Sequence, residues 1–251
     1  MADSYKHHVM LQAVVGVVIH GIVTAVPGPS VYYIEDSERQ FFMAPNLTFS
    51  QQKATVVLSA YNHCECRDFC FALGPTACQA WSVTESTQGN YWECRITNIG
   101  PETTVLLPDP KATYHFRKSS VLGTYSWQAD KLFYVALRGN CTSDAAKARC
   151  AKIPGHRLII VKSRQTYEFF GNLSTKNEKP LWVANLRKVT LTEFRWGDGS
   201  ISSVTNGTII INDGLLGTSF VSFNNKIDDS IESRDGPYRA LCQANPLGVE
   251  W

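Results

Sequence analysis

The sequence lacks the motifs that mark common enzymes and nucleic-acid-binding proteins. It contains no Gly-x-Ser-x-Gly elbow, no His-Glu-x-x-His motif and no glycine-rich phosphate loop. Lysine and arginine form no cluster, and the net charge is only +2, with 18% charged residues. We therefore expect neither enzymatic activity nor a nucleic-acid partner.

Groups that could act as a base or a nucleophile are also few. Three of the six histidines fall within the first 20 residues, and the others, His63, His115 and His156, are scattered along the chain. Each of these three is expected to be a surface or packing histidine. Every cysteine is expected to have a structural role, so a thiolate nucleophile is not expected either.

Only one apolar run approaches the length that a bilayer demands. It covers residues 9–26, is interrupted by Gln12 and His20, follows Lys6 and ends in small residues before Pro27. This is the order of a secretory signal, and the interruptions make it a poor lipid-spanning helix. We predict a signal peptide at residues 1–25 and no membrane insertion after its removal. The alternative is a retained signal anchor, which would give a type II membrane protein.

The cysteines and glycosylation triplets agree with secretion. Eight cysteines in 251 residues favour disulfides in an oxidising compartment. Four Asn-X-Ser/Thr triplets, which are acceptors for N-glycosylation, begin at Asn46, Asn140, Asn172 and Asn206. We therefore predict a secreted, extracellular glycoprotein with disulfide bonds.

The pattern of short runs predicts an α+β fold. Runs rich in β-branched residues and bounded by glycine, proline, asparagine or aspartate, such as TVVLSA and RLIIV, are typical of strands. The length suits two domains or one large one. A short polar connection divides the chain into predicted modules at residues 30–118 and 121–251.

A cysteine-rich stretch organises the first module. Cys66 and Cys70 are four residues apart, so on a helix their sulfurs leave the same face. We expect this helix to turn Phe69 and Leu73 inward, to leave its charged residues in water and to end at Gly74.

Zinc is the alternative to disulfides in this stretch. A zinc site needs four converging nitrogen or sulfur ligands. Here Cys94 is isolated in the sequence, and His63 is the single nearby histidine. Disulfides are therefore favoured, although four cysteines allow three pairings.

The cysteine spacing of the first module resembles that of the apple or PAN domain family. The matching cysteines are Cys66, Cys70, Cys78 and Cys94, followed by strand residues at 80–83 and a closing strand at 114–118. The resemblance implies a helix across a five-stranded antiparallel sheet. It also implies the disulfides Cys66–Cys94 and Cys70–Cys78.

The second module resembles a C-type lectin-like domain. A helix is expected to start at an N-cap at Ser143 or Asp144 and to carry Cys150, and a second helix is expected at 163–170. Further matches are the tryptophan-led strand at 181–184, the Trp-Gly-Asp-Gly-Ser turn at 196–200 and the closing strand at 238–242. The resemblance implies two helices, antiparallel sheets, a long loop and a Cys150–Cys242 disulfide.

The departures from this family concern its calcium site. Sugar-binding members hold calcium with a proline-containing acid and amide tripeptide and a later Trp-Asn-Asp. This chain has Asn212 and Asp213 without proline, and then Asp228 and Asp229 after an isoleucine. These four residues are candidate calcium and ligand contacts. Because the proline that fixes the backbone is missing, we expect no tight calcium site and no other cofactor.

Two further sets of residues are candidates for contacts outside the chain. Tyr91 and Trp92 lie before Cys94 at an expected hairpin and are candidates for exposed ligand contacts. Cys64 and Cys141 remain after the three implied disulfides. They would either bridge the two modules or link two chains into a dimer.

These patterns predict an extracellular recognition or adhesion protein, similar to invertebrate C-type lectin-like proteins. It would bind a protein or glycan without a conventional calcium-dependent sugar site, with innate immunity as one setting. The alternatives are a calcium-dependent lectin with a divergent site and a signal-anchored receptor.

Overall fold

The computed structural model describes residues 31–36, 39–86, 89–127, 131–161, 166, 181–182, 186–188, 194–196, 198–201, 218–219, 222–223, 227–228 and 238–247. The predicted signal peptide lies outside these residues, and so does the predicted second helix except for Thr166. Within the described residues, no helix is long and apolar enough to cross a membrane. The predicted α+β fold is confirmed: the sheets are largely antiparallel, helices are few and three disulfides are present.

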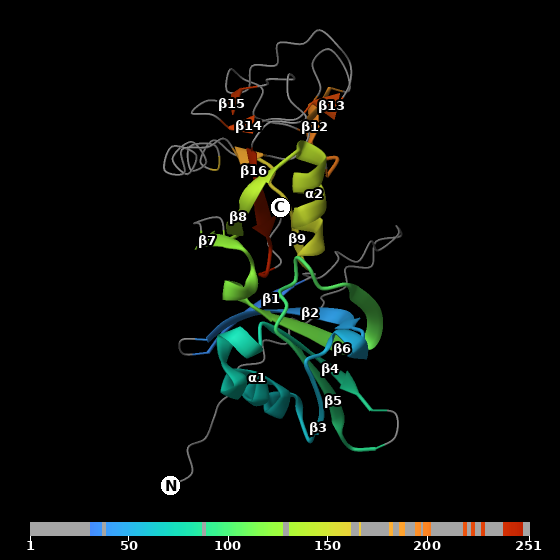
Figure 1. The fold of residues 1–251 in the computed structure, drawn as a ribbon. Helices are drawn as coiled ribbons and strands as arrows, with labels where there is room; N and C mark the ends of the chain where they lie inside the picture. Colours follow the sequence, from blue (N-terminus) through green and yellow to red (C-terminus); the bar gives the residue numbers. More distant parts are fainter. Residues whose placement is uncertain are drawn as a thin grey trace, which may run out of the picture.

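The first unit is a six-stranded antiparallel sheet in the order β1-β2-β6-β4-β5-β3 with helix α1 on one face (Figure 1). This is one strand more than the resemblance implies. Its elements are β1 (Tyr32–Asp36), β2 (Arg39–Phe49), β3 (Val56–Ala60), α1 (His63–Ala77), β4 (Ala80–Glu85), β5 (Trp92–Thr97) and β6 (Leu106–Arg117), with the 3₁₀ helices η1 (Gln51–Lys53) and η2 (Lys118–Ser120). β6 is long because the runs before and after Pro108 form one strand opposite β2.

Helix α1 begins at a reciprocal cap; one disulfide joins it to strand β5 and a second joins it to its own C-cap residue, Cys78. The Asn62 side chain accepts a hydrogen bond from the Glu65 amide at 3.1 Å, and the Glu65 carboxylate accepts one from the Tyr61 amide at 2.9 Å. The predicted disulfides Cys66–Cys94 and Cys70–Cys78 are both formed, with Cα separations of 5.6 and 5.3 Å.

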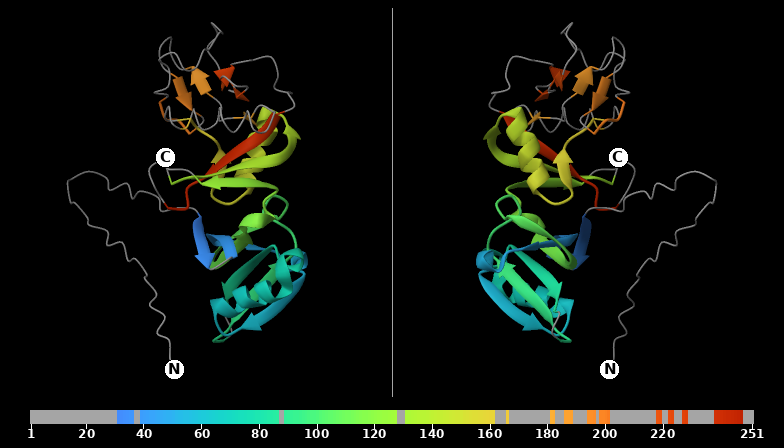
Figure 2. Two further views of the ribbon diagram at one scale, coloured as in Figure 1. Left: turned by 90° about the vertical axis from the view of Figure 1, so that its left-hand side faces the viewer. Right: turned by 90° about the vertical axis from the view of Figure 1, so that its right-hand side faces the viewer.

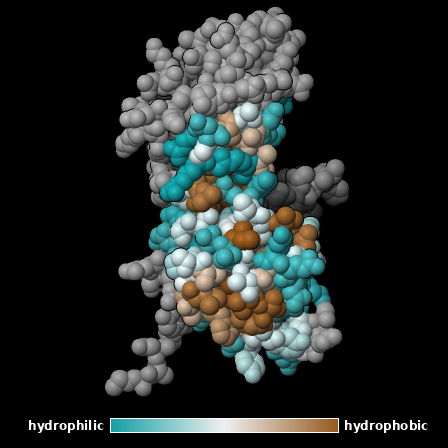
Figure 3. Space-filling view, in the orientation of Figure 1, coloured by the Kyte–Doolittle hydropathy of each residue, from teal (hydrophilic) through white to brown (hydrophobic). Residues whose placement is uncertain are grey.

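The prediction for the inward face of this helix was wrong. Phe69 and Leu73 are 44% and 42% exposed, because the face that turns to the sheet is centred on the buried Cys66 and Cys70. At 100° per residue, Phe69 lies about 60° from Cys66 and so beside that face, whereas Leu73 lies about 20° from Cys66 but directly before the kink at Gly74. Figure 3 shows an apolar area in the region of α1, and both residues are among the exposed large hydrophobic residues of the described part of the chain. The first helical segment ends at Gly74 as predicted, because the backbone there is non-helical, with φ of 78° and ψ of 172°, and a second short helical segment follows up to Ala77.

The second unit contains two further sheets. One has the order β15-β14-β10-β16-β8-β7, with β9 also paired to β16, and the other has the order β12-β11-β13. The elements are β7 (Gly123–Trp127), β8 (Phe133–Cys141), α2 (Ser143–Lys152), β9 (His156–Leu158), β10 (Leu181–Trp182), β11 (Leu186–Lys188), β12 (Phe194–Trp196), β13 (Thr218–Ser219), β14 (Ser222–Phe223), β15 (Ile227–Asp228) and β16 (Tyr238–Ala244).

Helix α2 is anchored to the closing strand by the third predicted disulfide. Cys150 of α2 and Cys242 of β16 are bonded, with their Cα atoms 5.4 Å apart. The N-cap of α2 is Thr142, one residue before the predicted Ser143, and its hydroxyl accepts a 3.3 Å hydrogen bond from the Ala145 amide. Thr142 is the last residue with an extended backbone before the helix. Its side chain can therefore reach the Ala145 amide and act as the N-cap.

The two units share one hydrophobic cluster where they meet. Phe42 and Phe116 of the first sheet belong to the same buried cluster as Phe133 of β8 and Cys150 of α2. The units are stacked end to end, with β7, β9 and the C-terminal end of α2 facing the first sheet (Figure 2). The relative position of the units is therefore fixed by packing as well as by the short connection through η2.

Candidate ligand-binding cleft

A buried histidine lies at the centre of the junction. The His156 ring has its Nδ1 atom 2.8 Å from the Pro154 carbonyl and its Nε2 atom 2.8 Å from the Tyr125 hydroxyl. Because a carbonyl can only accept, Nδ1 carries the proton and Nε2 accepts from Tyr125. Burial lowers the pKa of His156 to about 4 and raises that of Tyr125 well above its ordinary value, so both groups stay neutral.

A lysine is surrounded by aromatic rings at the same junction. The Lys118 ammonium lies 5.5 Å from the ring centroid of Phe133 and 5.8 Å from that of Tyr33. It also donates a 3.1 Å hydrogen bond to the side-chain oxygen of Gln40. These contacts connect the linker residue Lys118 to both units.

An ion pair crosses the junction on one side. The Glu102 carboxylate, in the loop between β5 and β6, lies 3.3 Å from Nη2 of Arg149 in α2. It also accepts a 2.8 Å hydrogen bond from the Leu122 amide, while Arg149 donates to the Arg138 carbonyl at 2.8 Å. The Glu102 side chain is only 10% exposed, so its charge is met by Arg149 and an amide rather than by bulk water.

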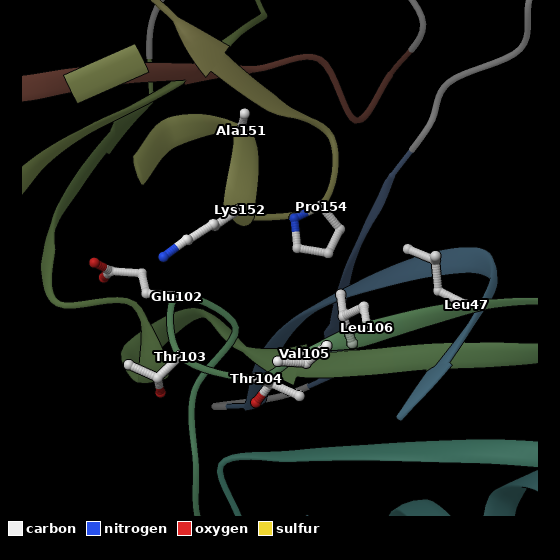
Figure 4. A pocket seen from close by; sticks show the side chains of 9 residues that line it. All are labelled: Leu47, Glu102, Thr103, Thr104, Val105, Leu106, Ala151, Lys152 and Pro154. Carbon is white, nitrogen blue, oxygen red and sulfur yellow. The ribbon is translucent and has the colours of Figure 1, made fainter. Parts of the chain in front are cut away.

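A cleft of about 630 Å³ opens beside this ion pair, and we call it the inter-unit cleft. It lies between the β5–β6 loop and β2 of the first unit and the end of α2 in the second (Figure 4). Its lining residues are Leu47, Glu102, Thr103, Thr104, Val105, Leu106, Ala151, Lys152 and Pro154. A volume of this size is in the range of sites that take small ligands or short segments of a larger partner.

The two ends of the cleft differ in polarity. Glu102 and Lys152 lie at one end, whereas Leu47 and Leu106 lie toward the other (Figure 4). Among the described residues, no ion pair or hydrogen bond involves the Lys152 ammonium. The cleft thus has an apolar wall beside the positive charge of Lys152. Solvent or a ligand has to balance that charge.

The aromatic residues predicted as contacts lie elsewhere. Tyr91 and Trp92 stand at the start of β5, at the opposite end of that strand from the loop that carries Glu102. Tyr91 is 37% exposed, but Trp92 is half-buried, with its ring 3.8 Å from that of His63. Trp92 is therefore less exposed than predicted, because its ring packs against the core cluster that contains Trp81, and a ligand contact by Tyr91 or Trp92 stays a prediction.

The predicted calcium residues cannot be placed together. Asn212, Asp213 and Asp229 lie outside the described residues, and Asp228 is described only as the end of β15. In the part of the chain that the structure describes, no group of three His, Cys, Asp or Glu residues is arranged to hold a metal. The calcium expectation thus stays a prediction.

The remaining cysteines do not bridge the modules. Cys64 is exposed near the start of α1 and has a free thiol, so the intramolecular bridge to Cys141 is not formed. Cys141 is half-buried at the end of β8, the strand that leads into the start of α2, whereas the other end of α2 faces the first unit (Figure 1). The stacked arrangement separates the two cysteines.

Two of the predicted glycosylation sites fall on described surface. Asn46 and Asn140 are both exposed, and Asn46 has a positive φ of 60° at the bulge in β2, directly before Leu47 of the cleft. Asn172 and Asn206 lie outside the described residues. Both described acceptors are accessible to a modifying enzyme.

Sequence reasoning did not find the inter-unit cleft. Its walls come from residues 47, 102–106 and 151–154, which no local motif connects. The nearest signal was Glu102, an acidic residue beside Pro101 in a loop, and such residues are usually solvated turn formers.

Comparison with known proteins gives only structural likenesses. No family model and no curated protein sequence matches this chain. One similar solved structure is CEL-IV, at 13% identity over 51% of this chain and 94% of that chain, with a TM-score of 0.38. Another is TC14, a C-type lectin from the tunicate Polyandrocarpa misakiensis, at 15% identity over 45% and 96%, with a TM-score of 0.37. A third is the C-type lectin CEL-I from Cucumaria echinata, at 16% identity over 47% and 93%, with a TM-score of 0.35.

Proposed function

We propose that this chain is an extracellular recognition protein that binds a protein or glycan ligand without a conventional calcium-dependent sugar site. In this proposal, an apple-like module at residues 30–118 precedes a C-type lectin-like module at 121–251. A signal peptide at 1–25 directs the chain out of the cell, and innate immunity is one setting for such binding.

The observation that carries the proposal is the disulfide between Cys150 of α2 and Cys242 of β16. It joins the first helix of the second unit to its closing strand, and β16 lies between β8 and β10 in the sheet. This is the arrangement that the sequence resemblance to C-type lectin-like domains implies. Three disulfides also suit an oxidising extracellular compartment.

The Trp-Gly-Asp-Gly-Ser turn gives independent support. Trp196 is 2% exposed, and its amide donates a 2.8 Å hydrogen bond to the Ser200 carbonyl. Asp198 accepts hydrogen bonds from the Ser200 amide and hydroxyl at 2.9 and 2.6 Å and pairs with Arg157 at 3.0 Å. The turn thus packs its tryptophan into the core, as the resemblance implies, while Asp198 stays at the surface with its carboxylate hydrogen-bonded within the turn.

The positions of the histidines also favour binding over catalysis. His115 and His156 are buried, and burial lowers their pKa values to about 3 and about 4. A general base must reach the proton that it removes, and neither ring can meet a substrate from within the core. His63 is exposed, and its ring packs against that of Trp92.

The proposal is tested by binding of the mature, glycosylated chain to a glycan array and to an array of extracellular protein domains, each with calcium and with EDTA. We expect retention on at least one probe that EDTA does not change. Retention lost in EDTA would replace the proposal with the calcium-dependent lectin. An absence of retention on both arrays would overturn it. N-terminal sequencing separates the secreted form, which starts near residue 26, from the signal-anchored receptor.

A further inference from the structure

We propose that the inter-unit cleft binds a linear peptide segment in which a carboxylate closely follows an aliphatic side chain. This inference rests on the proposed function and assigns to it a site and a ligand class. The site is built jointly by the first unit and by the end of α2, so neither unit contains it alone.

The apolar wall supplies the first half of the recognition. Val105 is 67% exposed, and it lies with Leu106 and Pro154 between the polar end of the cleft and Leu47 (Figure 4). Covering an exposed valine and its neighbours with an aliphatic side chain removes apolar surface from water on both partners. At roughly 25 cal/mol per Å² this is the main favourable contribution that such a wall can make.

The charge at the other end supplies the second half. Glu102 is already paired with Arg149 and with the Leu122 amide, so its negative charge is compensated within the protein. Lys152 has no such acid partner among the described residues, and its ammonium points toward the same end of the cleft (Figure 4). The charge left for a ligand is therefore positive, and it complements a carboxylate.

The polar groups of the cleft suit a peptide better than a sugar. A sugar ring brings several hydroxyls, each of which loses bound water on entering the cleft and needs a new partner. The Thr104 hydroxyl already donates a 2.9 Å hydrogen bond to the Gly100 carbonyl, and five of the lining residues offer only apolar side chains. An aliphatic side chain makes no such demand, and none of the described lining residues is aromatic, so none offers a ring for a sugar to stack on.

The cleft is also formed in advance of binding. The Glu102–Arg149 pair holds one edge, and the buried cluster around Phe42 and His156 fixes the distance between the units. A ligand therefore does not have to bring the two walls together, which reduces the entropy cost of binding.

The test uses the full mature chain on an array of short peptides in which leucine or valine precedes aspartate or glutamate. Matched peptides carry asparagine or glutamine in place of the acid. The acidic peptide that binds best is then labelled, and its affinity is measured by fluorescence polarisation. We expect the acidic peptide to bind about tenfold more tightly than its amide counterpart, and its affinity to fall with added salt.

Matched variants locate the site. Lys152→Glu and Val105→Asp should each weaken the labelled peptide about tenfold or more. Lys147→Glu, on an exposed position of the same helix, and Val57→Asp, on the exposed side of β3, should leave its affinity unchanged. Unchanged thermal midpoints of the four variants show that each is folded.

Three results overturn the inference. The first is an array on which no acidic peptide binds better than its amide counterpart. The second is peptide binding that Lys152→Glu does not weaken, and the third is a carboxylated or sulfated glycan that shows the Lys152 dependence instead. If the chain binds a ligand that none of the cleft variants affects, the proposed function stands and only this inference fails.

Discussion

The hydroxyl of the half-buried Tyr125 donates a 2.8 Å hydrogen bond to Nε2 of the buried His156 at the junction. Both rings also contact Phe42 of the first sheet, with centroid distances of 5.4 and 5.6 Å. The bond therefore holds β7 and β9 together against β2. The other ring nitrogen of His156, Nδ1, donates to the carbonyl of Pro154, which follows α2 in the chain. The hydrogen bond of Tyr125 thus also helps to fix the position of α2 beside the cleft.

Removing that hydroxyl should destabilise the protein. Tyr125→Phe leaves the Nε2 atom of His156 buried without its donor, so we expect a loss of about 1 to 3 kcal/mol in the free energy of unfolding. Urea titration followed by tryptophan fluorescence measures it. Tyr91→Phe, at a 37% exposed position, is the control and should change the free energy by less than about 0.5 kcal/mol. Equal effects of the two substitutions would contradict the role of the buried bond.

Acid should destabilise the protein in a defined window. Burial lowers the pKa values of His156 to about 4 and of His115 to about 3, whereas an unfolded histidine titrates near 6.5. Between pH 6.5 and these lowered values the unfolded state binds protons that the folded state does not, so stability falls as the pH falls. For His156 alone the loss is about 3 kcal/mol, from 1.36 kcal/mol per unit of pKa.

This pH dependence can be separated from that of the carboxylates. Thermal midpoints of the native chain and of His156→Gln are compared at several values between pH 7.5 and 4. The variant is less stable at neutral pH but should lose less stability on acidification. A parallel decline of the two proteins would show that His156 does not contribute to the acid sensitivity.

The ion pair at the junction should couple more strongly than a surface pair. A double-mutant cycle with Glu102→Gln and Arg149→Met should give a coupling of about 1 to 2 kcal/mol, because the Glu102 side chain is 10% exposed. Arg67 and Asp68, with side chains 32% and 60% exposed, provide the matched surface pair and should couple by less than about 0.5 kcal/mol. If both cycles give the same value, the junction pair does not hold the units together.

The disulfides should differ in their contribution to stability. Cys150 and Cys242 are 92 residues apart, whereas Cys70 and Cys78 are 8 apart. From loop entropy, replacing the first pair by serine should cost about 4 to 5 kcal/mol and replacing the second about 2 to 3 kcal/mol. Chemical denaturation of the two double variants checks the order. A larger loss for the Cys70–Cys78 variant would mean that packing rather than loop length dominates.

The free thiol of Cys64 should react in the folded chain. Cys64 is exposed, so the monomer should take up maleimide there under native conditions, and Cys64→Ser should remove that labelling. If oxidation instead links two chains through Cys64, the native chain should run as a dimer in non-reducing electrophoresis, and Cys64→Ser should run as a monomer. Labelling that survives in Cys64→Ser would place the reactive thiol elsewhere.

Local spacing in the sequence determined much of the architecture. The four-residue spacing of Cys66 and Cys70 placed both sulfurs on one helical face, and both are bonded: Cys66 to Cys94 of β5 and Cys70 to Cys78 at the end of the helix. The β-branched run TVVLSA became β3, and the Cys150–Cys242 pairing followed from a resemblance that covers the second module. The helical face and the strand are set by periodicity and so depend on neighbouring residues, whereas the pairing of Cys150 with Cys242, 92 residues apart, came only from the resemblance.

Other features depended on how the elements pack. Phe69 and Leu73 look like the inward side of α1 from their apolarity, yet the disulfides fix the rotation of the helix and leave both exposed. Trp92 was predicted to be a surface aromatic, but its neighbours on the sheet bury half of it. A side chain's exposure is a property of the packed surface around it, which a single segment does not specify.

The junction and its cleft were decided by tertiary structure alone. Tyr125 and His156 are 31 residues apart, and Glu102 and Arg149 are 47 apart, so no local pattern connects either pair. The sequence determined which residues are apolar, which are charged and which cysteines lie close enough in a helix to act together. Only the stacking of the two units placed Phe42 against His156 and Lys152 across a cleft from the β5–β6 loop. These contacts exist only when both sheets are formed and packed end to end.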